Sequence, residues 1–225
     1  MEYKMSASLM CMDFLDFKQQ LEILDKYMDL FHIDIIDGVY SKNLSLSPTL
    51  MEYFNKVITK PMDVHLATLY PEDWIELSAK AGAKYISLQY DVIQNQAFRL
   101  FQKIRDYNCL PGLVINPAIT VEQSFNCLSK IDLLTIMMVD PGFPGQKFVY
   151  ESLKNIEEAA NVREKNNFSY KIQVDGSVNQ NTYKSLIDAG ADIFVLGSSG
   201  LFNLDQDINN ACEIQKKDFL NAIKK

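Results

Sequence analysis

The sequence alternates between short apolar runs and longer stretches with helical periodicity, and this alternation constrains the fold more than any other feature. The apolar runs occupy 5–10, 30–36, 62–66, 85–88, 112–115, 133–139, 172–174 and 193–196. The helix-like stretches that follow them occupy 13–26, 47–58, 71–81, 95–107, 120–128, 150–164, 180–189 and 207–223. Strict βα alternation implies a parallel sheet with right-handed crossovers. Eight units in 225 residues, against about 250 in a typical example, predict an α/β fold, a (β/α)₈ TIM barrel, with one domain over 1–225.

A local repeat supports this organisation. The segments AGAKYISL (81–88) and AGADIFVLG (189–197) lie about half the chain apart and each joins a helix end to a strand. Gly82 and Gly190 in these segments fit left-handed positions at helix C-termini. The alternative is a doubly wound open sheet, but no G-x-G-x-x-G loop follows any of the early strands, which weakens that reading.

Composition excludes several classes of protein. Apolar residues make up 48% of the chain, which is enough for a sizeable core. The net charge of −7 argues against a nucleic-acid partner, and no apolar run is long enough to span a membrane. The four cysteines have no paired spacing and are typical of reduced thiols, and the first ten residues do not resemble a signal peptide. We therefore expect a cytoplasmic protein.

The candidate chemistry begins with the only two histidines of the chain, each of which lies next to an acid in an apolar run. His32 precedes Asp34 by two residues, and His65 lies in the run PMDVHL (61–66) two residues after Asp63. Residues two apart on a strand share a face, so His32 and Asp34 can converge on one point. Asp175 ends a third run, and barrel chemistry sits at such strand ends. His32, Asp34, His65 and Asp175 predict a divalent metal site. The alternative is that both histidines are hydrogen-bonded strand residues without a metal.

Three glycine-bearing turns end the later strands: DPGFPGQ (140–146), DGS (175–177) and GSSG (197–200). Small residues let backbone N–H groups approach an anion closely, and barrels of this type commonly bind phosphate in the loops after the seventh and eighth strands. The turns therefore favour a phosphate site over merely tight connections.

These residues carry a family resemblance. The segments SASLMCMDF (6–14), FHIDIIDG (31–38), VDPGFPGQ (139–146), QVDGSVNQNTY (173–183) and AGADIFVLGSSGLFN (189–203) resemble those of the ribulose-phosphate 3-epimerase family in order, over nearly the whole chain. Within the family, the sequence is most similar to the branch that acts on D-allulose 6-phosphate. The resemblance implies a barrel of the ribulose-phosphate-binding type, one divalent metal ion per chain with no organic cofactor, and a homo-oligomer.

The resemblance also implies individual roles. The metal ligands would be His32, Asp34, His65 and Asp175, and the catalytic acid–base pair would be Asp34 and Asp175. The substrate-binding residues would be Ser8, His65, Gly142, Phe143, Pro144, Gly145, Asp175, Gly176, Ser177, Gly197, Ser198 and Ser199. The chain departs from the family pattern at Ile36 and Ala67, where methionines are usual, and at Gln89, where histidine is usual.

The implied function is a metal-dependent isomerase of the 3-epimerase type that interconverts D-allulose 6-phosphate and D-fructose 6-phosphate. Two carboxylates on opposite sides of the sugar can remove and return the C3 proton, and a metal can stabilise the enediolate. The nearest alternative is the pentose reaction, from D-ribulose 5-phosphate to D-xylulose 5-phosphate. A non-catalytic sugar-phosphate-binding barrel is a further alternative, although a simple binder would not need two opposed bases.

Overall fold

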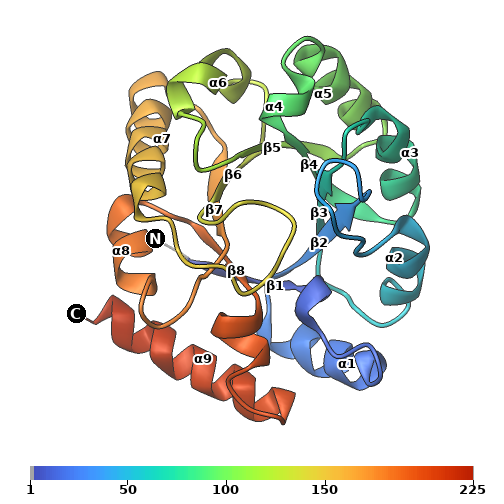
Figure 1. Cartoon of the computed structure of the whole chain (residues 1–225), viewed down its shortest axis with the longest axis vertical. Coiled ribbons are helices and arrows are strands. Elements are labelled where there is room, and N and C mark those ends of the chain that lie inside the picture. The colour runs from blue at the N-terminus through green and yellow to red at the C-terminus, as the bar shows by residue number, and fades with distance from the viewer. Residues whose placement is uncertain (1–2, 225) are drawn as a thin grey trace.

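The computed structural model describes residues 3–224, which form a closed barrel of parallel strands surrounded by helices (Figure 1). The strands follow one another around the barrel in sequence order, and β8 closes the ring against β1. The strands are β1 (Lys4–Ser8), β2 (Leu30–Ile36), β3 (Met62–Ala67), β4 (Ala83–Gln89), β5 (Leu110–Ile115), β6 (Leu133–Met137), β7 (Lys171–Asp175) and β8 (Ile193–Leu196). The TIM barrel predicted from the alternation is confirmed.

Helices cover the outside of the ring in Figure 1. They are α1 (Phe17–Tyr27), α2 (Pro48–Phe54), α3 (Glu72–Lys80), α4 (Tyr90–Ile93), α5 (Ala97–Asp106), α6 (Val121–Leu128), α7 (Leu153–Asn166), α8 (Tyr183–Ala189) and α9 (Ile208–Ile223). Three short helical turns, η1 (Leu9–Cys11), η2 (Tyr150–Ser152) and η3 (Ser198–Phe202), complete the set. Over residues 3–224, no helix is both long and apolar enough to cross a bilayer.

Local chemistry explains several helix ends. Thr120 and Gln123 form a capping box at the start of α6, and the Asp207 carboxylate accepts two backbone N–H groups at the start of α9. Gly190 ends α8 with a φ of +108°, and Gly82, just after α3, has a φ of +98°. The left-handed geometry predicted for both glycines is therefore confirmed.

Some predicted boundaries differ from the structure. The first strand ends at Ser8 rather than at residue 10, because the chain turns there into η1. The sixth strand ends at Met137 rather than at residue 139, and beyond it the Met138 carbonyl accepts from the N–H of Val149 at 2.8 Å. The helical stretch predicted at 95–107 is α5, with a separate turn, α4, directly after β4.

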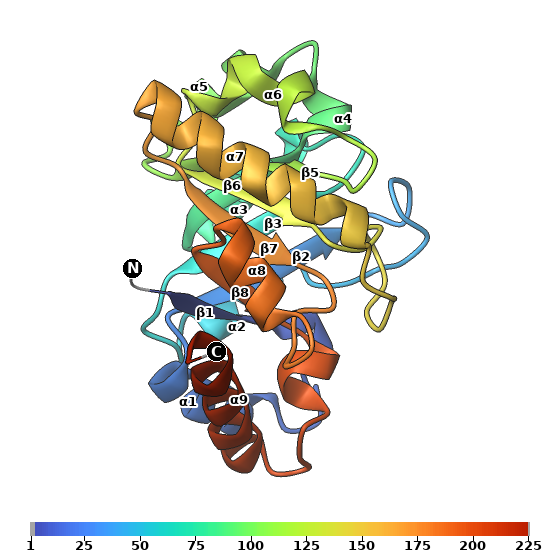
Figure 2. The same cartoon turned by 90° about the vertical axis from the view of Figure 1, so that its left-hand side faces the viewer.

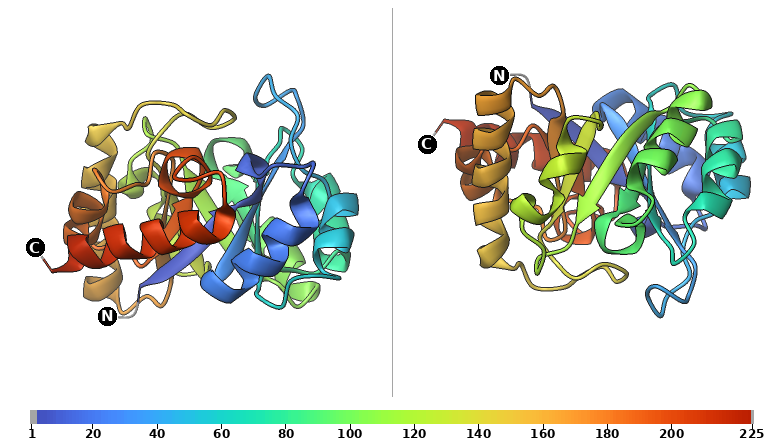
Figure 3. Two further views of the ribbon diagram at one scale, coloured as in Figure 1. Left: turned by 90° about the horizontal axis from the view of Figure 1, so that it is seen from below. Right: turned by 90° about the horizontal axis from the view of Figure 1, so that it is seen from above.

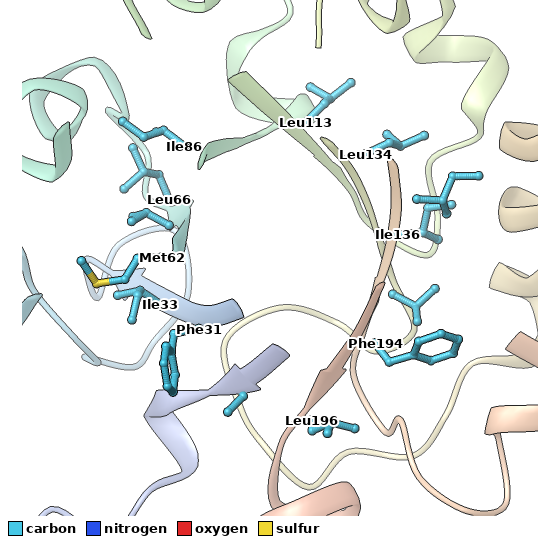
Figure 4. Close-up of a cluster of buried hydrophobic side chains, with 14 of the residues drawn as sticks. Phe31, Ile33, Met62, Leu66, Ile86, Leu113, Leu134, Ile136, Phe194 and Leu196 are labelled. Atoms are coloured by element: carbon cyan, nitrogen blue, oxygen red, sulfur yellow. The ribbon is translucent and has the colours of Figure 1, made fainter. Parts of the chain in front are cut away.

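Side chains alternate between the two faces of each strand, and the outward face is apolar. Phe31 and Ile33 on β2, together with Leu66 on β3, are fully buried in the main hydrophobic cluster between strands and helices. Figure 4 shows such side chains around the strand ring, with Phe194 and Leu196 on β8 among them. This layer attaches the helices to the barrel.

The inward face carries a different chemistry. Leu30, Leu133 and Ile193 close the interior near the amino-terminal ends of the strands, as a small apolar plug. Above the plug, the strands present mainly polar side chains, nearly all of them buried. They are Ser6, Ser8, His32, Asp34, Asp63, His65, Ser87, Gln89, Thr135, Gln173 and Asp175. The barrel interior above the plug therefore offers polar and ionisable groups for binding or catalysis.

The loops at the carboxyl ends of the strands gather on one side of the barrel. The loops 37–47 and 138–149 project from that side in Figure 2, and both views of Figure 3 show the same arrangement. The N-terminus lies at the opposite end. In Figure 1 the yellow loop after β6 crosses in front of the barrel centre.

Candidate active site

Two imidazoles and two carboxylates meet inside the barrel. His32, Asp34, His65 and Asp175 each offer one ligand atom, and these atoms lie within 4.8 Å of one another. His32 Nε2 is 3.3 Å from Asp34 Oδ1 and 3.5 Å from Asp175 Oδ2, and His65 Nδ1 is 3.1 Å from Asp34 Oδ1. The structure thus brings together all four residues that the sequence pattern singled out as metal ligands.

Strand register places these residues. Asp34 lies opposite His65 across the β2–β3 pair, and His32 lies opposite Asp63 one layer deeper. Asp63 lies two residues before His65 in the sequence, but in the structure its carboxylate contacts His32 instead. The reason is that lateral neighbours in a sheet are closer than residues two apart along a strand.

Asp63 is fully buried and holds the deeper imidazole. Its Oδ2 lies 2.8 Å from His32 Nδ1 and accepts from Gln173 Nε2 at 2.6 Å, while its Oδ1 accepts from Ser87 Oγ at 2.9 Å. A carboxylate on one ring nitrogen fixes the tautomer and leaves the other nitrogen free as a ligand. Asp63 therefore directs the lone pair of His32 Nε2 toward Asp34 and Asp175.

The donor set suits a divalent cation. His32 Nε2 is buried and has no hydrogen-bond partner among the described residues, although two carboxylate oxygens lie nearby. An unpartnered buried nitrogen is costly unless something else occupies its lone pair. Two imidazoles and two carboxylates are ordinary ligands of zinc and related ions, so the residues present fit a metal.

The environment separates the ionisation of the two carboxyl groups. Burial raises the pKa of Asp175 to about 6, and the nearby Asp34 carboxylate adds to that effect. Burial also opposes the ionisation of Asp34, but the His32 and His65 imidazoles outweigh it and hold the pKa of Asp34 well below its usual range. A pair of carboxyl groups with divergent pKa values is suited to acid and base roles.

A cavity opens above these residues. Every residue predicted to bind substrate lines it, as do Asp34, Ile36 and Ala67. The predicted substrate-binding residues are Ser8, His65, Gly142, Phe143, Pro144, Gly145, Asp175, Gly176, Ser177, Gly197, Ser198 and Ser199. Ser8 Oγ donates to Asp34 Oδ2 at 3.1 Å and so holds this carboxylate in place. His32 does not line the cavity, because it lies one layer deeper.

The loop after β6 is held across the cavity by the loop after β2. Asn43 Nδ2 donates to the Gly142 carbonyl at 2.7 Å, and Ser41 Oγ donates to the Pro141 carbonyl at 3.3 Å. A Cβ on Gly142 would lie 1.8 Å from Ser41 Oγ, and its φ is +115°. Only glycine permits this close approach.

The loops after β7 and β8 are joined to each other. Asn179 Nδ2 donates to the Ser177 carbonyl at 3.0 Å and to Ser199 Oγ at 3.1 Å. A Cβ on Gly200 would lie 2.1 Å from the Val178 carbonyl oxygen, so a larger residue there would push η3 away from the β7 loop. These contacts bring the small residues of both turns to one side of the cavity.

Several residues around the site are not among those predicted to bind substrate or metal. Met10, Cys11 and Gln146 also line the cavity, and Gln173 supports Asp63 from below. A period of two in β7 would have placed Gln173 on the same face as Asp175, but nothing in the sequence indicates its partner across the barrel.

Fold and site together define a barrel whose cavity, at the carboxyl ends of the strands, holds groups suited to acid–base chemistry. Comparison with known proteins narrows this class. A family profile, the ribulose-phosphate 3 epimerase family, matches residues 4–202. The ribulose-phosphate 3-epimerase of Bacillus subtilis (strain 168) is 33% identical over 198 residues, which cover 87% of this chain and 91% of the relative. The enzyme of the same name from Escherichia coli (strain K12) is 31% identical over 200 residues, 88% of each chain. The chain therefore belongs to the ribulose-phosphate 3-epimerase family, and it is an isomerase.

Solved structures agree on the fold. A tryptophan synthase α-subunit mutant from Pyrococcus furiosus superposes with a TM-score of 0.69 over 100% of both chains, at 13% identity. A 3-hexulose-6-phosphate synthase gives a TM-score of 0.68 over 96% of this chain and 99% of its own, at 14% identity. At such low identity these likenesses establish the barrel alone.

Proposed function

We propose that this epimerase interconverts D-ribulose 5-phosphate and D-xylulose 5-phosphate by inverting C3. The observation that carries the proposal is the pair Asp34 and Asp175, whose carboxyl groups meet at the base of the cavity from strands separated around the barrel by β1 and β8. The names of the curated relatives support the pentose substrate over a hexose one.

Two-base epimerisation requires one group that is ionised and one that carries a proton. The low pKa of Asp34 leaves it as a carboxylate able to remove the C3 proton, which is acidified by the neighbouring carbonyl. The pKa of Asp175 is raised in the metal-free protein, which makes Asp175 the carboxyl group that more readily carries the proton to be returned to the opposite face. In the reverse direction the two roles exchange. Only C3 changes configuration, and both carboxyl groups regain their starting states by proton exchange with water.

We further propose that His32, Asp34, His65 and Asp175 hold one divalent ion per chain. When bound, the ion would act as a Lewis acid for the negative charge that develops on the enediolate. The protein supports this arrangement through Asp63, which fixes His32, and through Ser8, which fixes Asp34.

The substrate phosphate is proposed to bind between the β7 and β8 turns. Gly176, Ser177, Gly197 and Ser198 line this side of the cavity and offer backbone N–H groups and hydroxyls, as phosphate sites in such barrels commonly do. The loop that carries Gly142 lies above them and would limit access of water.

A hexulose phosphate, D-allulose 6-phosphate, is a second candidate substrate, and one observation favours it. Ile36 and Ala67 both line the cavity beside His65, at positions where the family pattern has methionine. The smaller Ala67 side chain leaves room for one additional CHOH unit. This reading ranks below the pentose reaction because the names of the relatives point the other way.

The proposal is tested by assaying the purified protein with both sugar phosphates under identical conditions. We expect kcat/KM to be higher for D-ribulose 5-phosphate. A tenfold preference for D-allulose 6-phosphate, which corresponds to about 1.4 kcal/mol of transition-state binding, would assign the hexose reaction instead. Binding of either sugar phosphate without turnover would indicate a non-catalytic barrel.

We also propose that the protein assembles as a homo-oligomer. The support is family resemblance alone. Light scattering on the purified protein tests it, and a monomer at micromolar concentration would contradict it.

A further inference from the structure

The second imidazole of the site has a neighbour that the metal-site reading leaves unexplained. Gln89, at the end of β4, is fully buried, and its Nε2 lies 2.8 Å from His65 Nε2. The other amide atom of Gln89, Oε1, is buried without a hydrogen-bond partner among the described residues. His65 Nδ1, by contrast, faces Asp34 at 3.1 Å.

This arrangement constrains the tautomer of His65. A neutral imidazole carries one N–H and one lone pair, and the nitrogen that binds a metal must offer the lone pair. Nδ1 is the nitrogen of His65 that faces the other ligands, so Nε2 must carry the proton in the metal-binding form. An N–H at Nε2 needs an acceptor, and the amide nitrogen of Gln89 is not one.

Reversing the Gln89 amide resolves both problems at once. The oxygen and nitrogen of a glutamine side chain have nearly the same shape, and their assignment depends on the hydrogen-bond network. With Oε1 in the place of Nε2, Gln89 accepts from His65 Nε2–H, and the unpartnered oxygen finds its partner. The buried oxygen is then no longer an orphaned acceptor, and the amide nitrogen takes its former place.

We infer that Gln89 is a positioning residue that selects the Nε2–H tautomer of His65 and so directs the Nδ1 lone pair to the metal. This inference rests on the proposed metal site. The two imidazoles would then be opposite tautomers, each held by its own buried neighbour. Asp63 holds the proton of His32 on Nδ1 and frees Nε2, while Gln89 holds the proton of His65 on Nε2 and frees Nδ1.

The first test measures metal affinity rather than turnover. Full-length protein is stripped with a chelator and titrated with zinc against a competing chromophoric chelator. Loss of a buried partner of a metal-binding histidine typically weakens the metal site about 10–100-fold. We expect that loss for Gln89→Leu, which keeps the volume and removes the acceptor. Gln89→Glu keeps an acceptor at the same place and should bind zinc within about threefold of the wild type or more tightly, by the same reasoning.

A matched control is available in Gln215, another buried glutamine, which contacts Tyr183 and Met5 behind the barrel wall. Gln215→Leu should leave zinc affinity unchanged even if it lowers the melting temperature. Equal zinc affinity in Gln89→Leu and the wild type would overturn the inference. So would an equal loss in Gln89→Leu and Gln89→Glu.

The second test needs no variant. The chain has only two histidines, so long-range ¹H–¹⁵N spectra of the zinc-loaded wild type resolve both rings. We expect a protonated Nε2 on His65 and a protonated Nδ1 on His32. An unprotonated Nε2 on His65 would refute the role of Gln89. Failure of the wild type to take up zinc, cobalt or manganese would instead refute the proposed metal site, so the two failures are distinguishable.

Discussion

The two faces of strand β2 carry opposite chemistry within seven residues. Phe31, Ile33 and Ile35 point outward and are buried against the helices in the main apolar cluster, whereas His32 and Asp34 point inward and join the candidate active site. Both sets are almost fully shielded from water. The difference lies in what shields them, because the outward set contacts hydrocarbon and the inward set contacts other polar groups.

This contrast separates stability from function. Outward side chains are apolar and need only packing contacts. Burial of each contributes about 1.5–3 kcal/mol to the free energy of unfolding. Among the described residues, inward side chains leave buried atoms without a hydrogen-bond partner, including Ser6 Oγ, His32 Nε2 and Gln173 Oε1. Such atoms lower stability in the free protein, and at His32 Nε2 a bound metal ion would complete the buried nitrogen.

The largest effect on activity is expected from substitutions on the inward face. Asp34→Asn and Asp175→Asn should each lower kcat by up to about 10⁴-fold, because each face of the sugar requires its own proton donor or acceptor. Steady-state assays measure the loss. Asp188→Asn, an exposed change on α8 that loses only a surface ion pair with Lys184, is the control. Near wild-type turnover in either active-site variant would contradict the two-base mechanism.

The corresponding substitution on the outward face is Ile33→Ala. Ile33 lies between the inward residues His32 and Asp34 of β2. Ile33 is fully buried, and truncation of such a side chain costs about 2–5 kcal/mol. We expect a lower free energy of unfolding in urea with kcat nearly unchanged for the molecules that remain folded. A large fall in kcat at full folding would show that the two faces are not independent.

The raised pKa of Asp175 predicts that a substitution on the inward face increases stability, whereas Ile33→Ala decreases it. The folded pKa of about 6 exceeds the unfolded value of about 3.9, so the folded protein holds more protons between these values and loses stability as the pH rises through them. Above pH 6 the buried charge costs about 3 kcal/mol in metal-free protein. Asp175→Asn should therefore raise the melting temperature at pH 8 in the presence of a chelator.

The same substitution provides its own control through pH. At pH 4 the folded carboxyl group is protonated and the unfolded one, with a pKa of about 3.9, is only about half ionised, so most of the gain from Asp175→Asn should be lost. Thermal melts at pH 4 and pH 8 measure the difference. An equal effect at both values would mean that burial of charge is not the cause.

The smallest effect is expected at the boundary between barrel and solvent. Asn43→Ala removes the hydrogen bond to the Gly142 carbonyl, which is worth about 0.5–1.5 kcal/mol. We expect KM for the sugar phosphate to rise several-fold, with kcat and zinc affinity unchanged. Asn166→Ala, which removes a hydrogen bond to the Val162 carbonyl on the far end of α7, is a matched control. An unchanged KM would show that this contact does not hold the loop over substrate.

Much of the fold could be predicted because βα alternation is a property of local sequence. Apolar runs and helical periodicity gave the order of the elements, and the requirement that parallel strands be joined by crossovers left few topologies. Boundaries were less predictable where tertiary contacts decide them. The end of β6 is an example, since the N–H of Met138 donates to the carbonyl of Asp175, which lies far away in the sequence.

The site divides in the same way. The sequence by itself determined that His32 and Asp34 share one face of a strand and that His65 and Asp175 lie in two further apolar runs, since short-range spacing fixes which residues share a face. Only the tertiary structure decided that Asp63 supports His32, and that Gln89 faces His65. Those contacts depend on the register between neighbouring strands and on the closure of the barrel. Register is set by the packing of all eight strands at once, so no local stretch of sequence contains it.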